Sequence, residues 1–314
     1  MFRIALLSIC LLGVARIPLF GQGQGITLAG SGYSDPTVIK VAPGQITTFF
    51  VTGLKTILPS GSVSATSIPL PASLAGISVT FNQPGPKSYT AALLALKQLP
   101  ACVGGGSSAT SPPSPTPDCL ITAITVQVPF ELPYLDPNGG LIDTALVVSE
   151  NGNASAGFGV FPKMDNIHIL NTCDAFPPVS SKAASCQPVV THGGGTLVTA
   201  DAPAKAGEEI VIYAFGLGKG GLGFLEGEYL LFDLAINAGP KNPQYPRAPG
   251  AIPTSNYVGL VAGYVGLYQI NITIPGDLVT PFACGDTDVR SNLTIDFGEV
   301  FSFDGAPICI QATR

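Results

Sequence analysis

The two histidines, His168 and His192, are the side chains best suited to acid–base chemistry near neutral pH. A hydrolase triad needs a histidine that an acid orients toward a nucleophile. His168 lies in the alternating segment "NIHIL", which is typical of a strand, and His192 precedes three glycines at 193–195. Both contexts favour a structural or solvent-exposed role, and the two histidines lack the helical spacing of a zinc-binding pair.

Paired carboxylates are the second candidate chemistry, because two acids can support glycoside hydrolysis. Three pairs occur: Glu208 with Glu209, Glu226 with Glu228, and Asp286 with Asp288. All lie in Gly-rich or polar segments, where acids commonly form turns. Turn formation and solubility are therefore the preferred interpretation.

Calcium binding by oxygen ligands is the third candidate chemistry. Two segments offer them, one through Asp136, Asn138 and Asp143 and the other through Asp286 and Asp288. Neither fits the twelve-residue loop that ends in glutamate, so turns are again preferred. The Gly-rich segment at 216–228 lacks the Gly-Lys-Ser/Thr end of a phosphate loop and indicates a wide loop between strands. We expect no enzyme activity, no cofactor and no metal site.

The segments that carry these side chains belong to an internal sequence repeat. "VAPGQITTFFVTGL" at 41–54 returns as "AKAGEEIVIYAFGL" at 204–217, and "ITAITVQVPFELP" at 121–133 returns as "VGLYQINITIPGDL" at 265–278. In each half a strand begins after a glycine and ends at a Gly-Leu turn. Such repetition predicts two domains of one design, and 314 residues suit that number.

Short β-branched and aromatic runs between turn signals predict a β-sandwich in each half. The predicted strands are 37–40, 46–52, 77–81, 120–128, 145–149 and 156–161, then 196–199, 209–215, 232–237, 257–260, 268–274, 292–296 and 308–311. Asn151-Gly152 is a predicted hairpin turn. Residues 89–99 fit a short helix or a strand.

The amino-acid composition limits the classes of molecule that the protein is expected to bind. The formal charge is -6 and only 11% of residues are charged, which argues against nucleic acid and anionic lipid because both require a basic surface. Tryptophan is absent, so sugar stacking on Trp is not available. We expect an unknown extracellular ligand, either protein or glycan.

The N-terminus predicts export. Arg3 precedes an apolar run at 4–15, and small residues near 21–25 suit a signal peptidase. Residues 1–24 are therefore a predicted signal peptide, with a buried strand or a membrane anchor as the alternative. No later run reaches ~18 apolar residues, so no membrane insertion of the mature chain is expected. The predicted location is secreted or cell surface.

Cysteine usage agrees with export. Besides Cys10 in the apolar run, the chain contains Cys102, Cys119, Cys173, Cys186, Cys284 and Cys309. Six cysteines allow fifteen pairings, and proximity favours Cys102–Cys119, Cys173–Cys186 and Cys284–Cys309. Each bridge would stabilise the fold by roughly 3 kcal/mol. The short Cys-x-x-Cys spacing of a zinc site is missing.

Several segments resemble an uncharacterised domain family found in secreted proteins of soil Acidobacteria such as Solibacter. The resemblance rests on "APGQ…FVTGL", "ITVQVPFELP" and above all "GLYQINITIP" at 266–275, and it spans about 38–314. Each half is more distantly similar to IPT/TIG immunoglobulin-like domains. The cysteine pairs and the Pro/Ser-rich insert depart from the family pattern. The resemblance implies a fold and a location but assigns no catalytic residue.

These observations predict an all-β protein with two tandem Ig-like β-sandwich domains after a signal peptide. The predicted boundaries are 1–24 for the signal peptide, 38–162 and 191–314 for the domains, and 163–190 for a linker with a disulfide clamp. We expect a binding, adhesion or spacer protein that binds through the loops 104–117, 216–228 and 239–253. The alternatives are a carbohydrate-active enzyme, an accessory carbohydrate-binding module and a structural envelope component.

Overall fold

The protein is nearly all β, as predicted. The computed structural model describes residues 25–32, 39–100, 117–172, 174, 187–218, 230–233, 255–274, 276, 293–297, 300–301 and 306–311. Within these ranges the one helical element is a 3-10 turn, Pro117–Cys119, and no helix has the length and apolar character needed to cross a membrane. The predicted signal peptide, 1–24, lies outside the described residues.

Two sheets enclose the core of the first half. One has the order β1 (Thr27–Ser31), β3 (Ile46–Thr52), β9 (Leu120–Gln127), β8 (Ala92–Pro100) and β4 (Ser62–Ser64). The other has the order β2 (Lys40–Val41), β12 (Phe158–Pro162), β10 (Thr144–Glu150), β6 (Ile77–Gln83) and β5 (Ser73–Leu74), with β7 (Lys87–Thr90) and β11 (Asn153–Ala154) beside it. Alternate residues of both sheets fill one core, in which Phe49 meets Phe81 edge-on.

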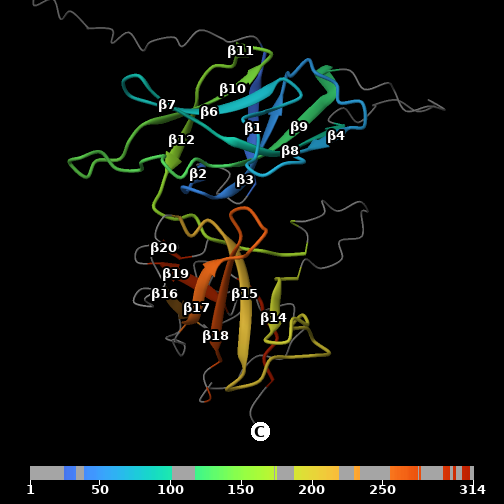
Figure 1. Ribbon diagram of the computed structural model, residues 1–314, viewed down its shortest axis with the longest axis vertical. Coiled ribbons are helices and arrows are strands. Elements are labelled where there is room, and N and C mark those ends of the chain that lie inside the picture. The colour runs from blue at the N-terminus through green and yellow to red at the C-terminus, as the bar shows by residue number, and fades with distance from the viewer. Residues whose placement is uncertain are drawn as a thin grey trace, which may run out of the picture.

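The second half has its own core. Its main sheet has the order β13 (His168–Ile169), β15 (Glu209–Phe215), β18 (Tyr268–Thr273) and β17 (Ser255–Leu260), with β14 (Val190–His192) also paired to β15. A small sheet of β16 (Leu230–Asp233), β19 (Thr294–Phe297) and β20 (Val300–Phe301) accompanies it. Leu293 and Ile295 join the same core as Ile210 and Ile270. Figure 1 shows the blue-to-green and the yellow-to-red strands as two bodies.

The sequence repeat is a repeat of strand order and register. The order β1-β3-β9-β8 in the first half is matched by β13-β15-β18-β17 in the second. Ile46 pairs with Gln127 where Glu209 pairs with Thr273. The two halves therefore share one backbone design.

The Gly-Leu step that ends β3 and β15 is equivalent in both halves. Gly53 and Gly216 have φ values of +84° and +81°. A Cβ on Gly53 would overlap the carbonyl oxygen of Gly25, and a Cβ on Gly216 would overlap that of Asn166. Only glycine satisfies both the backbone conformation and the space at these positions.

The structure differs from the predicted element boundaries in several places. β1 pairs with β3 although it precedes the predicted start of the first domain, and β13, expected from "NIHIL", lies inside the predicted linker and contributes Ile169 to the second core. Residues 89–99 are extended, because β8 pairs with β9 over its length. The predicted strands 196–199 and 308–311 are single bridges, at Leu197 and Ile310.

Replacing Gly53 or Gly216 with alanine should lower the free energy of unfolding by about 3 kcal/mol, because a backbone clash adds to the cost of a positive φ. Gly85→Ala is the matched control: its φ is +81° and nothing lies within 4 Å of an added Cβ, so its loss should be about 1 kcal/mol. Urea unfolding gives the three losses. Equal losses at the three positions would contradict the close approach.

Candidate functional site

The junction between the halves is made by backbone and amide contacts. The backbone N–H of Lys163 donates to the carbonyl of Val41 at 2.8 Å. Nδ2 of Asn166 donates to the carbonyl of Lys40 at 3.1 Å and to Oε1 of Gln45 at 3.3 Å. Gln45 and Asn166 are both buried, so the contact between their amides is shielded from water and ties the start of the second half to the first.

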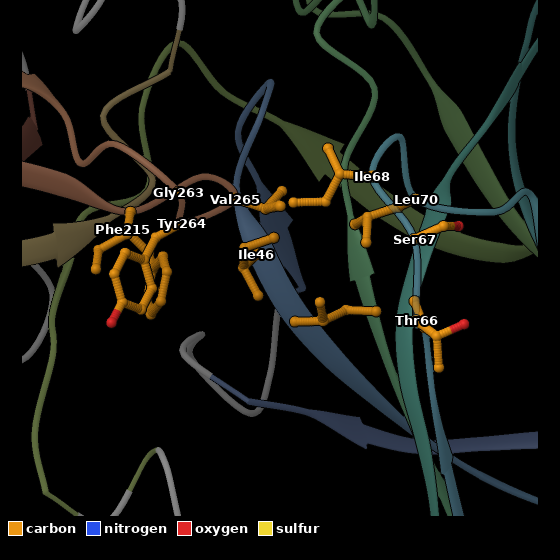
Figure 2. Close-up of a pocket in the computed structure, with 12 residues that line it drawn as sticks. Ile46, Thr66, Ser67, Ile68, Leu70, Phe215, Gly263, Tyr264 and Val265 are labelled. Carbon is orange, nitrogen blue, oxygen red and sulfur yellow. The ribbon is translucent and has the colours of Figure 1, made fainter.

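A groove with a volume of ≈ 430 Å³ lies beside this junction. Its lining includes Ile46, Ile68 and Leu70 from the first half and Phe215, Tyr264 and Val265 from the second. Figure 2 shows Ile68 and Leu70 on one side, Phe215 and Tyr264 on the other, and Ile46 and Val265 between them. Its volume lies within the range of small-ligand sites.

Two large apolar side chains mark the rim of the groove. Ile68 is 73% exposed and Tyr264 is 66% exposed, so apolar surface on both sides of the groove is open to solvent. The described residues that line the groove include no carboxylate, histidine, lysine or arginine. The groove can therefore bind an apolar group, and its described lining lacks the carboxylate, histidine and lysine side chains that commonly serve in general acid–base catalysis.

His192 contacts an acid that the sequence did not single out as its partner. Its Nδ1 faces Oε1 of Glu208, and its Nε2 faces the carbonyl of Ala202 at 3.1 Å. Because both nitrogens face acceptors, the doubly protonated ring satisfies both contacts. The hydrogen bond with Glu208 raises the pKa of His192, although burial opposes it. Burial also opposes ionisation of Glu208, but hydrogen bonds from His192 and Lys205 outweigh it and lower the pKa of Glu208.

His168 holds a turn. The side chain is buried, and its Nε2 lies 2.7 Å from Oδ2 of Asp174. The same carboxylate oxygen accepts the backbone N–H of Asn171 at 2.7 Å. This contact fixes the chain that follows β13.

The structure separates Glu208 from Glu209. Glu208 faces His192, whereas Glu209 accepts hydrogen bonds from Asn256 and Asn271. Neighbouring residues of an extended chain point in opposite directions. The two carboxylates therefore do not converge on a common substrate.

Asp136 forms the turn that the sequence predicted. Its Oδ1 accepts the backbone N–H groups of Asn138 and Gly140, both at 2.8 Å. A hollow of ≈ 560 Å³ borders Asp136 and Asp143, but Lys87 also lines it and opposes a cation there. Within the described ranges no cluster of three or more His, Cys, Asp or Glu side chains suits a metal ion.

Several predicted positions lie outside the described residues. These are Glu226, Glu228, Asp286, Asp288, Cys102, Cys173, Cys186, Cys284, the loop 239–253 and most of the loops 104–117 and 216–228. Cys119 and Cys309 are described, and each is disulfide-bonded. No two described cysteines lie at disulfide distance from one another, so the three pairings stay predictions.

Glu150 is a buried acid that the sequence analysis missed. Its carboxylate accepts the backbone N–H groups of Lys55 and Thr56, at 3.0 and 2.6 Å. Burial opposes ionisation, yet these hydrogen bonds lower the pKa of Glu150. Because its partners are 95 and 94 residues away in the chain, no local pattern could have revealed the contact.

Comparison with known proteins gives no match: no family model matches the chain, and neither does any curated protein.

The His192–Glu208 contact predicts a pH-dependent stability. The pKa of His192 is raised from 6.5, so its contribution is complete below pH 6.5 and is lost as the pH rises through the folded-state pKa. The pKa of Glu208 is lowered from 4.5, so its contribution is complete above pH 4.5 and is lost as the pH falls through the folded-state pKa. The pair should stabilise the fold most between these two values.

Urea unfolding at pH 5.5 and 8.5 tests this expectation. The unaltered protein should lose more stability over this interval than His192→Gln, which has no titrating ring. Glu208→Gln should also flatten the dependence, because its amide cannot favour the charged imidazole. The same loss in all three proteins would show that the contact does not form.

Proposed function

We propose that the protein is a secreted or cell-surface binding protein without catalytic activity, built from two tandem Ig-like β-sandwich domains. The matching strand order of the two halves and their separate cores support the two-domain assignment. The resemblance to IPT/TIG domains supports the Ig-like assignment. The predicted signal peptide and cysteine pairs support export.

The observation that carries the proposal is the apolar groove between the halves. Its rim side chains, Ile68 and Tyr264, are left exposed in the structure, and their burial by a partner would be favourable. Because the described lining has no carboxylate, histidine, lysine or arginine, we favour binding over catalysis. We assign the groove to an extended peptide segment of a partner protein, whose apolar side chains would enter between Ile68 and Tyr264.

A displayed random-peptide library, panned on the full chain, tests the groove. Selected peptides should bind the double variant Ile68→Ser/Tyr264→Ser about tenfold more weakly or worse, since two central apolar contacts are lost. Leu141→Ser is the matched control, because Leu141 is also exposed, at 62%, but lies outside the groove. Fluorescence anisotropy gives the affinities.

Three results would contradict the proposal. They are no enrichment of peptides, equal binding by the double variant, and equal weakening by Leu141→Ser. Hydrolysis of a polysaccharide by the purified protein would instead favour the carbohydrate-active alternative.

A further inference from the structure

The outer face of β15, β18 and β17 carries a second set of side chains, separate from the groove. Cross-strand pairing places residues of the three strands in rows on this face. The rows are Val211, Asn271 and Tyr257, then Tyr213, Gln269 and Gly259. The intervening residues, such as Ile212 and Ile270, face the core. Aromatic and amide side chains therefore gather on one side of the sheet.

Tyr257 lies along its own strand. It is 43% exposed, and a Cβ on Gly259 would overlap the hydroxyl end of its ring. Gly259 has no positive φ, so this position supplies space for the ring and not an unusual backbone conformation. A tyrosine placed in this way offers an apolar ring surface together with a polar hydroxyl.

A network of hydrogen bonds fixes the amides beside this ring. Nε2 of Gln269 donates to Oδ1 of Asn271 at 2.9 Å, and Nδ2 of Asn271 donates to Oε1 of Glu209 at 3.2 Å. Nδ2 of Asn256 donates to Oε2 of Glu209 at 2.7 Å and to Oγ1 of Thr273 at 2.9 Å. Among the described residues, Oε1 of Gln269 and Oδ1 of Asn256 have no hydrogen-bond partner, so these oxygens can accept from a ligand.

The charged groups on the outer face of β15, β18 and β17 indicate which class of ligand it can bind. Glu209 is the one charged side chain among the named residues of the face, and each of its carboxylate oxygens already accepts a hydrogen bond from an asparagine amide. Among the described residues of this face an anionic ligand finds no lysine or arginine, and an apolar ligand would bury the amide oxygens without partners. A neutral polyhydroxylated ligand offers hydroxyls to the amides and C–H groups to the ring.

We propose that this face binds a neutral oligosaccharide, with Tyr257 as the stacking surface and Gln269 and Asn256 as acceptors for sugar hydroxyls. Gly259 is a positioning residue, because the ring of Tyr257 occupies the space that a side chain at this position would fill. This site is independent of the groove, since none of its residues lines the groove.

Isothermal titration calorimetry of the full chain tests the site with cellohexaose, xylohexaose and mannohexaose, and with hexagalacturonic acid as the anionic probe. At least one neutral hexasaccharide should bind with a Kd of about 1 mM or below. Tyr257→Ala should weaken that binding about tenfold. Tyr264→Ala is the matched control, because it removes another exposed tyrosine, at 66%, from the groove, and it should leave the affinity unchanged.

Gly259→Ala provides a second variant that keeps every aromatic and polar group. It should displace the ring of Tyr257 and weaken sugar binding by several-fold, with the far-UV circular dichroism unchanged. The proposal is overturned if no neutral hexasaccharide binds at millimolar concentration, if only the acidic oligomer binds, or if Tyr264→Ala weakens binding as much as Tyr257→Ala.

Discussion

The fold depends on a close approach of two backbones at the end of β3 and again at the end of β15. At Gly53 and Gly216 there is no room for a side chain, because the carbonyl oxygen of Gly25 or of Asn166, each two residues before a strand, fills that space. Each glycine is followed by a buried leucine, Leu54 or Leu217. The Gly-Leu turn therefore brings the chain at the start of β1 against β3, and the chain at the start of β13 against β15, and directs the leucine into the core.

In the second half the same step also shapes the junction. Asn166 donates its backbone N–H to the carbonyl of Gly216 at 2.8 Å, while its side chain reaches Lys40 and Gln45 in the first half. One residue thus belongs to both the repeated step and the joint. Two positions later, the carbonyl of Gly218 accepts the hydroxyl of Tyr268 at 3.0 Å. Burial raises the pKa of Tyr268 to about 12, so this hydroxyl remains a donor at neutral pH.

The strands β3 and β15 were predictable from the sequence because their alternating apolar residues and flanking glycines are local signals. Ile46–Thr52 and Glu209–Phe215 were predicted with the observed bounds. The strand Thr27–Ser31 was missed because "TLAGS" has little alternation, and its place is set by pairing with β3. Residues 89–99 were ambiguous because their apolar residues fit the period of a helix as well as that of a strand. Their pairing with β9 shows that they form a strand.

The proposed binding surfaces were less predictable than the strands, because they depend on residues far apart in the chain. Binding through the long loops stays a prediction, while the proposed groove brings together Ile46, Ile68 and Tyr264 from three segments. The groove cannot be inferred from the sequence neighbours of Ile68, since Phe215 and Tyr264 on its other side belong to the second half. The polar face was hidden for the same reason: Glu209 and Asn256 meet only through the register of β15, β18 and β17.

The proposed groove requires that the two halves form one body and keep a fixed position relative to each other. Pulsed electron paramagnetic resonance tests this directly, with spin labels on unnatural amino acids at the exposed positions Lys87 and Lys205. The junction contacts predict a single narrow distance distribution. A broad distribution, as expected for two halves on a flexible linker, would contradict the account.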